Sequence, residues 1–289
     1  MLYRPSTLSG DERREFETYA EDCREEMLDH VATIVQELPP DVVEIVYELA
    51  FSTSDALPKR ERRPKLDTVL VIDSVAEALS MPAPDRDALC KLTIVTQEYF
   101  DIVDDLLDGD VASDRETEAL LVSQLLVPTL MGLLSRFKAD ASTYWATQAQ
   151  EVMCVPMVES TATPDAETYR SLLDRQASLY GMLTGLAAVV NDESDDTIER
   201  YERLGETIYR HRQVVLDYEQ YQDGEDDPWN ARQLMDESAV LSLLATHEQT
   251  VDDLTADLPG PPRGRLRALV ALDTSAWQAS VSRPAEKSS

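Results

Sequence analysis

Apolar residues recur every three or four positions along most of the chain, and this spacing is typical of amphipathic helices. Proline and glycine clusters end these stretches, and Pro128 inside one of them predicts a kink. The pattern contains no internal repeat and no interdomain linker. It therefore predicts a single all-α domain of about ten helices over residues 1–281, followed by a disordered polar tail at 282–289. The predicted helices lie at 10–38, 41–52, 65–80, 85–108, 115–138, 140–156, 165–190, 195–221, 230–257 and 263–280.

Composition supports a folded helical protein and restricts its partners. Hydrophobic residues make up 43% of the 289 positions, and only 9 are glycine. The chain carries 56 acidic and 26 basic residues, a net charge of −30. This balance argues against binding to nucleic acid, which needs cationic surface, and against docking on anionic lipid. Many acids with few lysines indicate adaptation to a salty cytosol, where the Debye length is about 3 Å at 1 M salt. The alternative, an acidic disordered chain, conflicts with the apolar content.

The cysteines and the N-terminus indicate a cytoplasmic protein. Cys23, Cys90 and Cys154 are scattered and odd in number, so we expect neither a disulfide framework nor a zinc site, and interpret all three as small core residues. The first residues, Met-Leu-Tyr-Arg-Pro, turn charged at once and do not resemble a signal peptide. We find no apolar run of the roughly 18–20 residues that a membrane span needs. The expectation is a protein without a membrane span.

An acidic cluster ends the predicted helix at 85–108. Asp104 and Asp108 are four positions apart and share a helix face, with Asp101 on nearly the same stripe and Asp105 beside it. Like charges at this spacing repel each other, and a bridging cation would remove the repulsion. Mg²⁺ suits this role because it takes one or two carboxylates and completes its shell with water and phosphate oxygens. The alternative is a solvated acidic face.

Four segments together resemble the motifs of one enzyme family. Asp104-Asp105-Leu106-Leu107-Asp108 is similar to the first aspartate-rich motif of trans-prenyl diphosphate synthases, and Arg60-Glu61-Arg62-Arg63-Pro64 resembles the basic loop that precedes it. Further along, Arg175-Gln176-Ala177-Ser178-Leu179 resembles the family's Lys-Thr-Ala-x-Leu segment. The stretch from Leu204-Gly205 to Asp217-Tyr218 resembles the second aspartate motif. The resemblance covers residues 20–257 and implies a helical bundle of the isoprenoid-synthase type around a central cavity.

The resemblance also implies an activity and its residues. The family joins isopentenyl diphosphate to an allylic prenyl diphosphate, using Mg²⁺ to stabilise the leaving diphosphate. The floor of the product tunnel lies one helical turn before the first motif. The implied roles are Mg²⁺ binding by Asp104, Asp108 and Asp217 with Asp105 in support, isopentenyl diphosphate binding by Arg60 and Arg63, allylic diphosphate binding by Arg175, a substrate contact at Gln97, and a tunnel floor at Tyr99 and Phe100.

Several positions depart from the family pattern. The second motif's first aspartate is replaced by Gln213, a weaker ligand for a hard cation, and the histidine expected ahead of the first motif is Gln97. Two arginines expected after the first motif fall at Ser113 and Asp114. The run Arg210-His211-Arg212 could supply substitute cations, or it could simply balance local acids. Each lost phosphate contact would cost about 1.5–3 kcal/mol.

Three hypotheses follow from these residues. The first is a divergent short-chain prenyltransferase, acting as a homodimer or as part of a heterodimer. The second is a catalytically impaired homologue that binds prenyl diphosphates or serves as a dimer partner, which the altered second motif favours. The third is a class I terpene cyclase, because Asn191, Asp195 and Glu199 stand at i, i+4 and i+8 as in a metal-binding triad. The alternative for this triad is acidic capping of a helix start.

Overall fold

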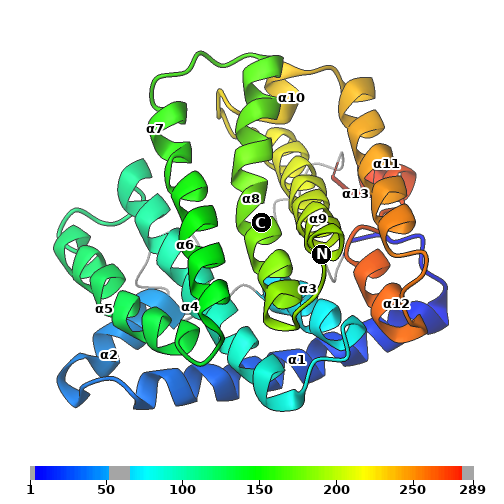
Figure 1. Cartoon of the computed structure of the whole chain (residues 1–289). Coiled ribbons are helices and arrows are strands. Elements are labelled where there is room, and N and C mark those ends of the chain that lie inside the picture. The colour runs from blue at the N-terminus through cyan, green and yellow to red at the C-terminus, as the bar shows by residue number, and fades with distance from the viewer. Residues whose placement is uncertain (1–3, 52–65, 282–289) are drawn as a thin grey trace, which may run out of the picture. The chain divides into compact units, whose positions relative to one another are not determined.

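The computed structural model describes residues 4–51 and 66–281, so Arg60 and Arg63 lie outside the described residues. The described residues form helices and no strand, which confirms the all-α prediction. The helices, shown in Figure 1, are α1 (Gly10–Gln36), a 3₁₀ turn η1 (Pro40–Val42), α2 (Val43–Val46), a π-helical turn η2 (Tyr47–Phe51), α3 (Leu66–Ala78), α4 (Ala83–Asp108), α5 (Glu116–Leu134), α6 (Ala139–Met153), α7 (Val155–Glu159), α8 (Ala166–Val190), α9 (Asp195–Gln222), α10 (Ala231–Leu234), α11 (Glu237–Leu254), α12 (Gly260–Ala268) and α13 (Thr274–Val281).

The chain divides into two compact units, each discontinuous in sequence. The first unit contains Met1–Glu17, Thr147–Gly185 and Asp195–Ser289. The second contains Thr18–Ala146 and Leu186–Ser194. The expectation of one domain over residues 1–281 stays a prediction.

The core of the second unit forms around α4, which packs against α3 and α5. Helix α3 is buried from Thr68 to Ala76, including its polar residues. Asp73 is buried to 2% exposure, and its carboxylate accepts hydrogen bonds from Tyr19 at 2.8 Å and Arg86 at 2.5 Å. Buried charge is tolerated here because it is paired and hydrogen-bonded. This network thus ties the start of α4 to α3 and α1.

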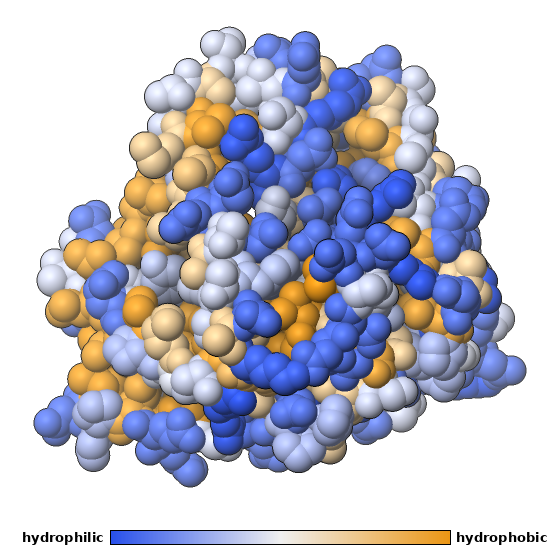
Figure 2. Space-filling model, viewed as in Figure 1, coloured by the Kyte–Doolittle hydropathy of each residue, from blue (hydrophilic) through white to orange (hydrophobic). Residues whose placement is uncertain are grey.

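Helix α5 buries one face and exposes a second apolar face. Its buried residues include Val122, Leu126 and Leu130, whereas Leu121 is 58% exposed. Figure 2 shows apolar surface on the side where α5 lies in Figure 1. The helix continues through Pro128, and the kink expected there stays a prediction. An 18-residue window within it has a mean hydropathy of 1.5 and is 39% buried, so α5 is long and apolar enough to cross a membrane. The expectation that no apolar segment reaches that length was therefore wrong for α5, although a core helix can pass the same test.

The core of the first unit forms where α9 packs against α10 and α11. Trp277 of α13 and Tyr218 of α9 lie in this core, with ring centroids 4.5 Å apart. Helices α8 and α9 approach closely at Gly205. The Thr184 hydroxyl on α8 donates a hydrogen bond to the Tyr201 carbonyl on α9 at 2.7 Å. A side chain at position 205 would collide with α8, which explains the glycine physically.

Some predicted boundaries and burials differ from the structure. The helix predicted at 230–257 is two helices, because Met235 is extended and the Asp236 side chain caps α11 by accepting from the Ala239 N–H at 2.8 Å. The helix predicted at 263–280 is likewise divided into α12 and α13. Cys154 is exposed, so its interpretation as a core residue was wrong, whereas Cys23 and Cys90 are buried.

Candidate functional site

The first aspartate motif lies on the last turn of α4. Asp104 and Asp108 are exposed and stand one turn apart, whereas Asp105 is buried to 8% exposure. Gly109 ends the helix with a φ of +73°, a left-handed conformation that glycine adopts without strain. The Gly109 and Asp110 N–H groups both bond to the Asp105 carbonyl, the second at 2.9 Å. This cap fixes the helix end and presents the two exposed carboxylates on one face.

Gln97 links α4 to α3 through buried hydrogen bonds. It is 4% exposed, and its Oε1 accepts a hydrogen bond from the Thr68 hydroxyl at 3.1 Å. Its Nε2 donates to Asp101 Oδ1 at 2.9 Å. The structure thus gives Gln97 a positioning role for α4, and its contact with substrate stays a prediction.

The exposed pair suits a divalent cation held mainly by outside ligands. Asp104 and Asp108 offer the carboxylate oxygens that Mg²⁺ prefers. Within residues 4–51 and 66–281, no three His, Cys, Asp or Glu side chains are gathered closely enough to hold a metal ion. Two carboxylates alone do not complete the six-oxygen shell of Mg²⁺, so a cation at this stripe would need further ligands from outside the pair.

Asp217 of the second motif is a buried hydrogen-bond acceptor. It is 4% exposed, and its Oδ2 accepts from the Tyr169 hydroxyl at 2.7 Å and from the Ala231 N–H at 3.0 Å. Its Oδ1 accepts from Gln213 Nε2 at 2.8 Å. Burial raises the pKa of Asp217, while these three hydrogen bonds act in the opposite direction. The carboxylate ties α8, α9 and the start of α10 together.

This arrangement does not fit a metal at Asp217. A carboxylate has about four lone-pair positions, and three of them are already occupied by protein donors. Gln213 uses its amide to bond Asp217, so the residue that replaces the family's aspartate serves the same network. Metal binding by Asp217 stays a prediction, and only one lone-pair position of the carboxylate would be left for it unless a donor moved away.

The cationic candidates differ in their surroundings. Arg175 is exposed on α8, so its guanidinium is accessible. Arg210 is paired with Asp174 at 2.7 Å and with Glu206 at 2.8 Å. For Arg210, this pairing agrees with the interpretation that the residue balances local acids.

The proposed tunnel-floor residues contact each other. Phe100 is buried to 8% exposure, whereas Tyr99 is half-buried. Their ring centroids are 5.4 Å apart, and the rings meet at 75°. This edge-to-face arrangement is one that aromatic pairs prefer. The role of either ring as the floor of a product tunnel stays a prediction.

The possible cyclase triad does not lie on one helix. Asn191 follows the end of α8 at Val190, and α9 begins at Asp195. The Asn191 amide donates to the Leu79 carbonyl at 3.1 Å and to Glu193 at 2.9 Å. Helical spacing therefore does not align Asn191 with Asp195 and Glu199, and the position of Asp195 in the first turn of α9 agrees with the alternative of acidic capping.

Two groups of buried residues carried no sequence signal. Tyr169 reaches Asp217 from a position 48 residues earlier in the chain. His211 and His247, from α9 and α11, lie with ring centroids 6.3 Å apart. Burial lowers the pKa of His211 to about 3 and that of His247 to about 4. Neither pairing has a periodicity or motif, because both depend on how helices pack.

Comparison by sequence finds no relative: no protein-family model matches the chain, and no curated protein does. Comparison by structure finds many similar folds. A geranyltransferase from Legionella pneumophila is 14% identical with a TM-score of 0.69, and the match covers 92% of this chain and 98% of that one. A geranylgeranyl pyrophosphate synthase from Corynebacterium glutamicum is 18% identical with a TM-score of 0.64, and the match covers 95% and 96%.

A third similar structure carries ligands. The polyprenyl synthase from Caulobacter crescentus, complexed with calcium and isoprenyl diphosphate, is 14% identical with a TM-score of 0.66. The match covers 94% of this chain and 98% of that one. The chain therefore has the fold of the trans-prenyl diphosphate synthases, as its motifs predicted.

Proposed function

We propose that the protein is a divergent short-chain prenyltransferase that joins isopentenyl diphosphate to an allylic diphosphate. The observation that carries the proposal is the pair Asp104 and Asp108, exposed one turn apart at the capped end of α4 in a chain with this fold. Carboxylates in this position can hold a divalent cation against a diphosphate. The Caulobacter crescentus structure, with calcium and isoprenyl diphosphate, supports this chemical class.

In this proposal, some residues would bind metal or substrate and others would hold the end of α4 in position. Asp104 and Asp108 would hold Mg²⁺, and the bound ion would offset the charge of the departing diphosphate. Buried Asp105 and the Thr68–Gln97–Asp101 chain would keep the helix end in place. Arg175, exposed on α8, would contribute a cation for the allylic diphosphate. Arg60 and Arg63 would bind isopentenyl diphosphate.

The test is turnover of labelled isopentenyl diphosphate with dimethylallyl, geranyl and farnesyl diphosphates, in molar KCl with Mg²⁺. We expect a prenyl product with at least one primer. The double variant Asp104→Asn/Asp108→Asn should lose activity by about 100-fold or more, because it removes charge that stabilises the reaction. Asp110→Asn, an exposed acid just beyond the motif, is the matched control and should stay within about twofold of wild type. Equal activity in both variants would refute a role for the motif.

A second candidate function is favoured by the Asp217 network. Because Tyr169, Gln213 and Ala231 occupy the Asp217 carboxylate, the chain could bind prenyl diphosphates without turning them over. It would then act as a binder or as a partner of an active subunit. Magnesium-dependent binding of geranyl diphosphate with no product from any primer would favour this function over the first.

We also propose that the exposed face of α5 packs against a second copy of the chain or a related subunit. Leu120, Leu121 and Met131 are 53%, 58% and 49% exposed on this helix, a large apolar area to leave in water. Sedimentation should give a dimer for wild type and a monomer for Leu121→Glu. Leu28→Glu, at a leucine 53% exposed on α1, is the control and should remain a dimer. A monomeric wild type would exclude the homodimer. The heterodimer would then be tested by mixing the protein with a homologue.

The proposal also includes the cellular compartment and the salt concentration in which the protein works. The large excess of acids and the scarcity of lysine support a cytoplasmic protein that works at high salt. Activity should rise with KCl up to molar concentrations, because screening reduces the self-repulsion of a chain with a charge of −30.

A further inference from the structure

Sulfur-containing side chains gather on the surface where α6 meets α7, in the first unit. Met153 ends α6, Cys154 precedes α7, and Met157 lies within α7. Met153 and Met157 are 40% and 73% exposed, and Cys154 is a free, exposed cysteine. By contrast, four other methionines are buried to 8% exposure or less: Met27, Met81, Met182 and Met235. Packing in the core therefore does not account for the three exposed sulfur residues.

The backbone keeps these three side chains on one helical face. Cys154 has φ −79° and ψ −15°, which is right-handed helical geometry, and its carbonyl accepts from the Val158 N–H at 3.2 Å. Successive residues of a helix turn by about 100°, so Met157 falls between Met153 and Cys154 within an arc of about 100°. Residues three and four apart on a helix have Cβ atoms about 5–6 Å apart. Because methionine has three rotatable bonds, both thioether sulfurs can reach the Cys154 sulfur.

One thiolate and two thioethers make a ligand set for a soft cation. Sulfur ligands select Cu(I), whereas carboxylate and carbonyl oxygens suit Mg²⁺ and Ca²⁺. The Cys154 thiol would release its proton when the metal binds, because the thiolate is the ligand. Glu151, exposed one turn before Cys154, and the net charge of −30 favour a cation at this surface over an anion.

We propose that Met153, Cys154 and Met157 form a binding site for Cu(I). Cys154 Sγ would be the thiolate ligand, and the two methionine Sδ atoms would complete a three-sulfur set. The site is independent of the proposed prenyl transfer, because none of its residues belongs to the aspartate motif on α4.

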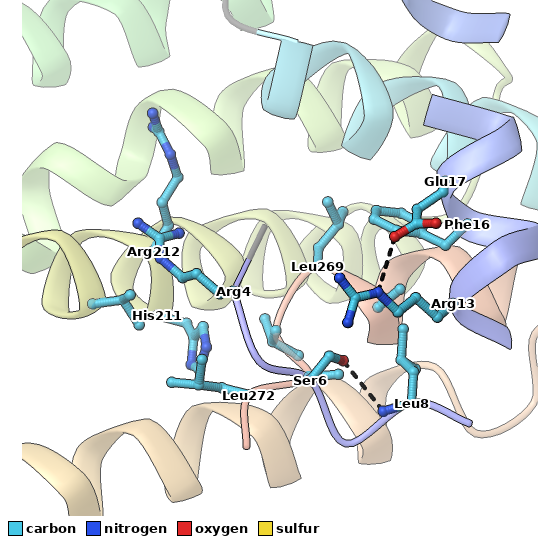
Figure 3. Close-up of a pocket in the computed structure, with 14 residues that line it drawn as sticks. Arg4, Ser6, Leu8, Arg13, Phe16, Glu17, His211, Arg212, Leu269 and Leu272 are labelled. Atoms are coloured by element: carbon cyan, nitrogen blue, oxygen red, sulfur yellow. Dashed lines mark hydrogen bonds and ion pairs between the residues drawn. The ribbon is translucent and has the colours of Figure 1, made fainter. Parts of the chain in front are cut away.

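Other ligands that copper favours are less accessible in the described part of the chain. Cys23 and Cys90 are each 4% exposed. His211 lines the cavity shown in Figure 3, but it is 3% exposed, and none of the described residues that line this cavity carries sulfur. Copper held by sulfur at the surface can therefore be distinguished from copper held by a buried histidine or thiol.

The experiment is anaerobic competition for Cu(I) between the full chain and the chromophoric chelator bicinchoninate, with ascorbate as reductant. The salt is potassium sulfate, because chloride itself binds Cu(I). We expect the protein to take one equivalent of Cu(I) from the chelator. The exposed thiol should react with an aromatic disulfide reagent in the free protein and become unreactive when Cu(I) is bound. No transfer of Cu(I) to the protein, or bound copper that leaves this thiol reactive, would overturn the proposal.

Matched variants separate a three-sulfur site from capture by an ordinary surface thiol. Met153→Leu/Met157→Leu should weaken Cu(I) binding by about tenfold or more, because it removes two soft ligands and keeps the thiol. Met131→Leu is the control, because Met131 is 49% exposed on α5 and should not contribute to binding. All three side chains are exposed, so these changes should leave the fold intact. Equal affinities in the double variant and the control would overturn the proposal.

X-ray absorption at the copper edge identifies the ligands directly. We expect sulfur neighbours around Cu(I) in the wild type, and fewer of them in Met153→Leu/Met157→Leu. A shell of nitrogen neighbours would place the metal at histidine and overturn the proposal. Asp104→Asn/Asp108→Asn should bind Cu(I) as the wild type does, so loss of prenyl transfer and loss of copper binding are separate results.

Discussion

Replacing Gly205 by alanine should test the close approach of α8 and α9. A Cβ atom at position 205 would lie 2.5 Å from the Tyr180 carbonyl oxygen and closer still to the Thr184 hydroxyl. Ordinary contact begins at 3.4 Å, so the Tyr180 carbonyl would have to retreat by about 0.9 Å. Because that atom is main chain within a helix, the two helices would have to separate instead of one side chain turning away.

The cost can be estimated from two parts. Overpacking a close contact costs roughly 1–3 kcal/mol. Separation of the helices would also weaken the hydrogen bond from Thr184 to the Tyr201 carbonyl, at about 1 kcal/mol. We therefore expect Gly205→Ala to lower the free energy of unfolding by roughly 2–4 kcal/mol, measured by urea denaturation in fixed KCl.

A matched control lies in the same unit. A Cβ atom added at Gly264 in α12 would meet no other atom within 4 Å, so Gly264→Ala should be neutral or stabilising by up to about 1 kcal/mol. Thr184→Ala combined with Gly205→Ala should recover only part of the loss, since the Tyr180 carbonyl remains in place. A Gly205→Ala protein as stable as wild type would refute the reasoning about this crossing.

Three further predictions follow from the buried network, the buried histidines and the paired rings. Tyr169→Phe should lower the free energy of unfolding by about 1.5–3 kcal/mol by removing a donor to a buried carboxylate, whereas Tyr221→Phe, at a tyrosine 39% exposed, should change it little. Because burial lowers the pKa of His247 to about 4, its stabilising contribution is complete above pH 6.5 and is lost as the pH falls toward 4. The free energy of unfolding of the wild type should therefore fall by about 2 kcal/mol more than that of His247→Gln when the pH is lowered from 7 to 5, as measured by urea denaturation. Equal falls in the two proteins would contradict the pKa argument. If the enzyme is active, at least one of the variants Tyr99→Ala and Phe100→Ala, assayed separately, should make a longer prenyl product. Unchanged products from both would show that neither ring limits the length of the product.

The all-α fold and most helix positions could be predicted from the sequence because they depend on local spacing. The apolar period of α4 and the glycine after it predicted a helix ending at the aspartates, and α4 ends at Asp108. The split between α10 and α11 was not predicted. Met235 is apolar and fits a helical period, and the extended turn there depends on the Asp236 cap.

The roles of individual residues were less predictable because they depend on partners distant in sequence. The sequence aligned Asp217 with a metal-binding motif, but the donors from Tyr169 and Ala231 that occupy it are brought there by the packing of α8 and α10 against α9. Gln97 was aligned with a substrate-binding histidine, yet its burial against Thr68 makes it a link between helices.

The sequence by itself determined the class of fold, the acidic surface and the exposed carboxylate pair at the end of α4. These follow from periodicity, composition and i, i+4 spacing, all of which act within a few turns of helix. Only the tertiary structure decided that the Asp217 carboxylate accepts three hydrogen bonds from protein donors, that position 205 must be glycine, and that His211 and His247 are buried side by side. Each of these results from the contact of segments far apart in the chain, where burial removes water and leaves every polar atom dependent on the partners that packing supplies.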